Sequence, residues 1–293
     1  MSDSKEVHMT RHVLAVTAAI LFLAAVACDG ASDEPDQASP PSSDTSTEID
    51  NALEISMKDF EFTIEGEAHA GSLLVNFTND GAQLHDAIIG KLDQGKTLED
   101  VEKLLRGGPE GPPPPWFDDA PHDMGIVSPG ETAGIVLEAE EGTYVLLCFM
   151  TDRKGVPHVA HGMMQTFEVS ATQAGAQAEA DQNITMSDEG LDAQELPAGA
   201  SLVKVTNDAD ETGELAILRI EDGATMSDVE KSFEKAASPD EVPATFYGGT
   251  HAILPGDSAQ FALDLEPGTY TFVISYGQGP DIRDIPTEVT VSD

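Results

Sequence analysis

Short stretches in which apolar and polar residues alternate are the dominant pattern of the chain, and they predict β-strands. Residues 74–78 (LVNFT) alternate in this way, and the Asn-Asp pair that follows is a turn signal. Two further apolar stretches, 135–137 and 144–148, flank a turn at Glu141-Gly142. Short strands at regular spacing, separated by Gly- and Pro-containing turns, are typical of a β-sandwich or Greek-key barrel.

Two segments depart from this pattern and predict short helices. Thr97 and Asp100 form a capping pattern ahead of apolar residues at helical spacing in 98–105. Thr225 and Asp228 repeat this pattern ahead of Met226, Val229 and Phe233.

The chain contains an internal repeat. Residues 70–103 align without a gap with 198–231 at an offset of 128, and 129–144 align with 255–270 at an offset of 126. One register held over 34 residues is not a chance match, and the period is too long for a solenoid. The repeat therefore predicts a domain duplication.

The duplication and the polar segments around it give the expected domain organisation. We expect an all-β protein with two Greek-key β-sandwich domains, at 51–170 and 183–293, each carrying one short helix. Ala- and Gln-rich residues 171–182 are the expected linker between them. A proline-rich segment at 107–116 (GGPEGPPPPW) predicts an extended loop, because proline does not fit a central strand.

The N-terminal segment has the pattern of an export signal. An apolar run at 13–27 is short for a membrane span, and small residues precede Cys28, so 1–27 are interpreted as a signal peptide, with Met9 as an alternative start. The junction resembles a lipobox, which makes Cys28 the candidate lipidation site and 28–50 a flexible acidic Ser/Pro tether. An extracytoplasmic protein, lipid-anchored at the cell surface or in the periplasm, is expected; the alternative is a secreted protein.

Composition narrows the classes of partner. With 14 Lys and Arg against 54 Asp and Glu, the net charge is −40, which excludes nucleic acid as a partner because phosphates would be repelled. The excess of carboxylates is interpreted as adaptation to a saline medium. Contact with a membrane is expected only through the N-terminal anchor, and the oligomeric state is left open.

Residues that can bind a soft metal gather in the first repeat. Cys148 is the only cysteine beyond the signal region, and the segment HVAHGMM follows it. A mononuclear copper site for electron transfer requires one thiolate, two imidazoles and a weak thioether. The candidates are Cys148, His85 from a distant strand end, and His158, His161, Met163 and Met164.

These motifs resemble the cupredoxins, the blue-copper family. The resemblance covers the expected first strand at 57–62, the segment FTNDGAQLHDAII, the strand GTYVLLC and the loop VPHVAHGM. It implies one copper ion, cycling between Cu(I) and Cu(II), held in the first domain by His85, Cys148, His158 and Met163. His161 and Met164 remain the alternates to His158 and Met163. One departure is Asp86, where many cupredoxins have Asn; it would raise the basicity of His85 or lower the copper potential.

The second repeat lacks these ligands. Gly213 stands at the position of His85 and Ile274 at that of Cys148, so no copper is expected there. The chain has no His-x-His pair for a second copper centre, no P-loop and no dinucleotide fingerprint. We therefore expect no catalytic activity.

The leading functional hypothesis is one-electron transfer through a type 1 copper site to a redox protein partner. That partner is expected to dock at an exposed imidazole edge of His158, whose apolar neighbours are Val156, Pro157, Val159 and Ala160. Two rival hypotheses are a metal-free surface interaction module and copper storage or delivery without redox cycling.

Overall fold

The structure is a computed structural model that describes residues 50–106, 122–173, 179–193, 195–234, 242–277 and 282–293. The predicted signal peptide at 1–27, Cys28, nearly all of the tether and the proline-rich loop lie outside the described residues.

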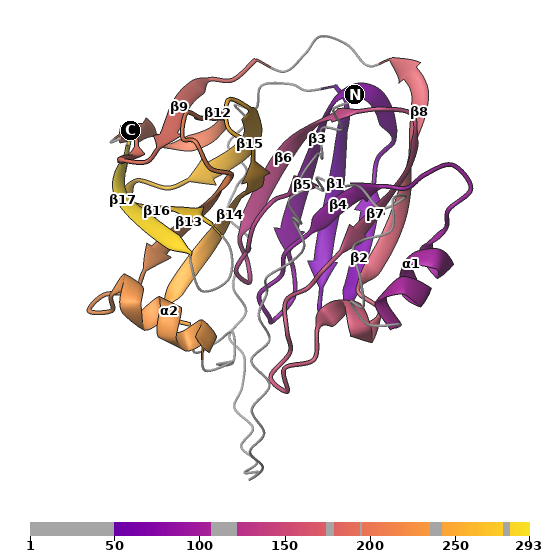
Figure 1. The fold of residues 1–293 in the computed structure, drawn as a ribbon, viewed down its shortest axis with the longest axis horizontal. Helices are drawn as coiled ribbons and strands as arrows, with labels where there is room; N and C mark the ends of the chain where they lie inside the picture. Colours follow the sequence, from indigo (N-terminus) through magenta and orange to yellow (C-terminus); the bar gives the residue numbers. More distant parts are fainter. Residues whose placement is uncertain (1–49, 107–121, 174–178, 194, 235–241, 278–281) are drawn as a thin grey trace, which may run out of the picture.

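The first half of the chain is a sandwich of two strand layers (Figure 1). One layer contains β1 (Ala52–Lys58), β2 (Glu61–Glu65), β3 (Ala68–Asn79) and β6 (Thr132–Ala139); the other contains β4 (Ile88–Lys91), β5 (His122–Asp123), β7 (Gly142–Leu147) and β8 (Met164–Gln173). Val75 and Phe77 of β3 meet Leu146 of β7 and Phe167 of β8 in one buried core. The alternation seen in the sequence therefore points every second side chain into the space between the layers.

The second half repeats this arrangement. Its layers are β9 (Gln182–Ser187), β10 (Gly190–Leu191), β12 (Gly199–Asn207) and β15 (Ser258–Leu265) against β11 (Glu195–Pro197), β13 (Gly213–Ile220), β14 (Ala244–Ile253), β16 (Gly268–Tyr276) and β17 (Arg283–Ser292). A second buried core lies between them. The predicted all-β fold is confirmed.

Each half carries one α-helix among its described residues, at the place that the capping pattern predicts. They are α1 (Leu98–Arg106) and α2 (Met226–Glu234). The backbone N–H of Thr97 donates to Asp100 Oδ2 at 3.1 Å, and that of Thr225 donates to Asp228 Oδ2 at 3.0 Å, so both starts are capped as expected. No helix within the described part of the chain has the length and apolar character needed to cross a membrane.

The expectation of one continuous first strand over residues 57–62 is wrong. Strand β1 ends at Lys58 and β2 begins at Glu61, with Asp59 and Phe60 forming a tight turn between them. The turn explains why Met57 and Phe62 are both buried although they lie five residues apart. In one continuous strand, residues an odd number apart point to opposite faces.

A continuous sheet joins the two halves. Strand β15 pairs antiparallel with β6 through Gln260–Val136, Phe261–Ile135 and Ala262–Gly134. The close approach depends on Gly134, where a Cβ atom would lie 2.9 Å from the Ala262 Cβ and 2.8 Å from Asn76 Oδ1. The edge strands β6 and β15 therefore hold the two halves together by backbone hydrogen bonds.

An apolar cluster, here called the interdomain cluster, strengthens this junction. Leu84 and Ile126 of the first half pack with Leu218, Phe246 and other residues of the second half. Leu84 directly precedes His85, so the cluster lies beside the candidate ligands. The second half therefore supports the segment that carries His85.

Replacing Leu218, which is 1% exposed, with Ala is expected to destabilise both halves together. The cavity in the interdomain cluster should lower the free energy of unfolding by about 2–5 kcal/mol. Native-state hydrogen exchange should report equal losses of protection at the His85 and Val127 amides and in the second half. The control Leu254→Ala removes the same side chain from a position that is 41% exposed and should change little. Loss of protection confined to the second half would contradict the coupling.

Candidate metal centre

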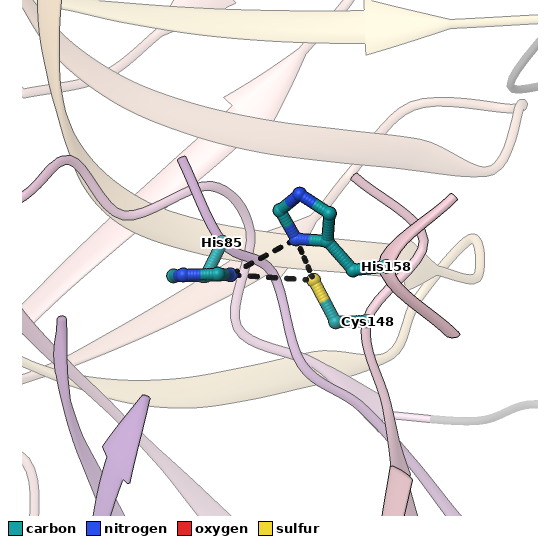
Figure 2. A group of neighbouring side chains, drawn as sticks. All are labelled: His85, Cys148 and His158. Carbon is teal, nitrogen blue, oxygen red and sulfur yellow. Dashed lines mark hydrogen bonds between the residues drawn. The ribbon is translucent and has the colours of Figure 1, made fainter. Parts of the chain in front are cut away.

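Three side chains from separate segments converge on one point (Figure 2). His85 lies in the loop between β3 and β4, Cys148 directly follows β7, and His158 begins a short 3₁₀ helix (His158–His161). The two Nδ1 atoms are 3.1 Å apart, and Cys148 Sγ lies 3.4 Å from His158 Nδ1 and 3.7 Å from His85 Nδ1. All three residues are 0% exposed.

This donor triangle has the size that a metal ion requires. The point equidistant from the three donor atoms lies about 2.0 Å from each, close to the ~2.0–2.3 Å at which imidazole nitrogen and thiolate sulfur bind a metal such as zinc. One thiolate and two imidazoles in a trigonal set match a blue-copper site. The cluster could therefore hold a metal ion without rearrangement of its donor atoms.

Backbone pairing fixes the position of His85. Its N–H and C=O both pair with Val127, which in turn pairs with Tyr247 of the second half. The buried amide of Asn79 donates to the carbonyl oxygens of Gln83 and Val127, which closes the loop that leads to His85. Asn207 makes the equivalent bonds in the second half, so this loop support belongs to both copies.

The loop from Cys148 to His158 is closed by its own hydrogen bonds. The N–H of His158 donates to the Met150 carbonyl at 2.7 Å, and the N–H of Val159 donates to the Cys148 carbonyl at 2.8 Å. Asp152 Oδ1 accepts from the backbone N–H groups of Lys154 and Val156. The polar residues of this loop therefore shape it and bring His158 back to Cys148.

The structure separates the two competing pairs of candidates. His161 lies outside the cluster and forms an ion pair with Asp152, with His161 Nε2 and Asp152 Oδ2 3.0 Å apart. Met163 is 0% exposed and shares the core that contains Cys148, whereas Met164 packs against the cluster around α1. Met163 also accepts a backbone hydrogen bond from Cys148 at 3.3 Å.

The expected exposed edge of His158 is absent, because this residue is 0% exposed, whereas docking of a partner at the neighbouring apolar residues stays a prediction. The Phe60 ring covers His158 edge-on, with the ring centroids 5.1 Å apart. Val159 is itself buried in the cluster around α1. Asp59 and Phe60 also belong to the site, although the sequence pattern predicts a strand at these two positions and not a site.

Burial keeps the donors uncharged before a metal binds. It lowers the pKa of His158 to about 4, with a further lowering by His85, and it also lowers the pKa of His85. Burial raises the pKa of the Cys148 thiol, and the Asp86 carboxylate raises it further. Asp86 itself accepts a hydrogen bond from the Phe149 N–H at 2.8 Å. A metal that binds here must therefore displace the thiol proton.

The equivalent position in the second half is filled by side chains. A Cβ atom on Gly213 would lie 2.6 Å from Cε1 of Tyr276 and 2.7 Å from Cε of Met186. Tyr276 and Met186 are both buried, and Ile274 replaces the cysteine. An imidazole at residue 213 would therefore collide with Tyr276 and Met186 as they stand.

Comparison with known proteins gives weak structural likenesses. No family model matches the chain, and no curated protein matches it. Similar solved structures include an auracyanin from Roseiflexus castenholzii (24% identity, 41% of this chain and 97% of that one, TM-score 0.29). Auracyanin A from Chloroflexus aurantiacus, described as a "blue" copper protein, has 21% identity over 41% of this chain and 98% of its own, with a TM-score of 0.27. The blue copper oxidase of Nitrosomonas europaea has 16% identity over 82% of this chain and 86% of its own, with a TM-score of 0.23.

The metal-free protein is expected to lose stability as the pH falls from about 6.5 towards 4. In this window His158 of the unfolded chain binds a proton that the folded chain does not, so acid favours unfolding. Urea unfolding of the metal-free protein at several pH values would measure this. The His158→Gln variant should show a smaller loss between pH 6.5 and 4. An identical pH dependence in the two proteins would contradict the assignment of a neutral, buried His158.

Proposed function

We propose that the chain is an extracytoplasmic copper protein that transfers single electrons through one type 1 site in its first half. The observation that carries this proposal is the buried triangle of His85 Nδ1, His158 Nδ1 and Cys148 Sγ. Copper bound there would exchange one electron between Cu(II) and Cu(I). Met163 is the proposed weak axial ligand, and a redox protein is the proposed partner. A lipid anchor at Cys28 would hold the protein at the membrane.

The chain's own residues favour metal binding with little rearrangement. The backbone N–H groups of Asp86 and Met150 donate to the Cys148 sulfur and favour its thiolate form. Backbone hydrogen bonds at His85 and His158 fix the main chain that carries the two imidazoles, and burial keeps water away from the rings. A site that changes little between two oxidation states can exchange electrons with a low barrier.

The donor set favours electron transfer over the enzymatic functions of multicopper proteins. Within the described residues, the only group of potential metal ligands is His85, Cys148 and His158. A reaction with oxygen or nitrite at copper would need further ligands and a route for substrate. We therefore propose a carrier without catalytic activity.

Copper addition to the metal-free full chain should produce an intense blue colour at one ion per chain. The colour arises from charge transfer between the Cys148 thiolate and Cu(II), so Cys148→Ser should abolish it. The matched control His161→Ala should stay blue, because His161 pairs with Asp152 outside the cluster. An optical titration with copper measures the blue colour and the number of ions bound per chain in each protein. Tight Cu(I) binding without a blue Cu(II) form would instead indicate storage or delivery, and no binding would indicate an interaction module.

Met163→Leu should keep the blue colour and change the reduction potential. A thioether in the axial position is a long, weak ligand that tunes the potential more than it holds the metal. Met164→Leu is the control, since Met164 packs on the other side, towards α1. Spectroelectrochemistry compares the reduction potentials of the two variants. If the potential shifted in Met164→Leu but not in Met163→Leu, Met163 would be excluded as the axial ligand.

A further inference from the structure

The turn between β1 and β2 has a conformation that needs an explanation. Its two residues are Asp59 and Phe60, and Phe60 has a φ of 68°. A bulky side chain in this left-handed region is an outlier. Such strain costs about 1–3 kcal/mol and is concentrated at functional sites.

Both turn side chains reach the imidazoles of the metal centre. Asp59 Oδ1 lies 3.4 Å from His85 Nε2, the ring nitrogen that does not face Cys148. The Phe60 ring lies against His158. The strained backbone thus presents one side chain to each histidine of the donor triangle.

A backbone hydrogen bond holds the carboxylate of Asp59 in place. The backbone N–H of Ala82 donates to Asp59 Oδ1 at 2.9 Å. Gly81 keeps the space open: a Cβ atom there would lie 2.6 Å from Asp59 Oδ1 and 2.8 Å from His85 Nε2. The contact between Asp59 and His85 therefore depends on a residue without a side chain at position 81.

The surroundings of His85 Nε2 offer this atom few polar partners. The atom is buried and makes no hydrogen bond within the described residues, and Asp59 Oδ1, at the ion-pair distance of 3.4 Å, is the acceptor that the structure places beside it. A buried N–H without a partner costs about 1–3 kcal/mol. The attraction of Asp59 for a proton on His85 acts against the lowering of the His85 pKa by burial.

We propose that Asp59 is a positioning residue for the metal centre. It holds the His85 proton on Nε2, so that the Nδ1 lone pair faces the metal, and its negative charge favours Cu(II) over Cu(I). A carboxylate that accepts the second N–H of a ligating histidine orients the ring and increases its basicity. The effect on copper rests on the proposed function, whereas the position of the proton does not.

The first test uses the metal-free full chain. Nitrogen-15 NMR of the His85 ring is expected to show the proton on Nε2 in the unaltered protein. The Asp59→Ala variant should lose this preference and show a mixture of tautomers. The same tautomer distribution in both proteins would overturn the proposal, whether or not copper binds.

The second test measures the reduction potential and the affinities for Cu(II) and Cu(I) in Asp59→Asn. Cu(II) affinity should fall about tenfold relative to Cu(I), which equals a rise of about 59 mV in potential. The control Glu61→Gln removes the same charge at an exposed position two residues away and should leave the potential nearly unchanged. An unchanged potential in Asp59→Asn, or an equal shift in both variants, would overturn the proposal. A clear Asp59 effect in the NMR test with no blue site in any protein would instead refute the copper function alone.

Discussion

The donor atoms of His85, Cys148 and His158 are held within 3.7 Å of one another although none of the three residues is accessible to water. Without a metal this arrangement is costly. Burial disfavours the charged form of all three groups, so both imidazoles stay neutral and the thiol keeps its proton. A metal ion at the centre of the triangle would bind all three donors. The rest of the first half can be understood as the support that keeps these atoms together.

That support extends into the second half of the chain. The backbone of Val127 pairs with His85 on one side and with Tyr247 on the other, and Leu84 enters the interdomain cluster. The second half has therefore kept the loop support, including Asn207. Its Tyr276 and Met186 side chains fill the place that corresponds to the metal centre of the first half. One copy carries the proposed chemistry and the other stabilises it.

Much of this could be predicted from the sequence, because the relevant signals are local. Alternation predicted the strands, capping residues predicted both helices, and the short segment after Cys148 supplied His158 and Met163 as candidates. The pairing of β6 with β15 could not be predicted, since it depends on the space left by Gly134. The contribution of Asp59 was also hidden, because the left-handed Phe60 that turns it towards His85 violates the usual preference of that residue.

X-ray absorption at the copper edge would test the central claim most directly. We expect the full chain loaded with copper to show one sulfur and two imidazole nitrogens as the nearest neighbours, with nearly the same distances in the oxidised and reduced forms. This result would show that the preformed triangle is the binding site. A shell of oxygen and nitrogen without sulfur, or loss of an imidazole on reduction, would contradict it.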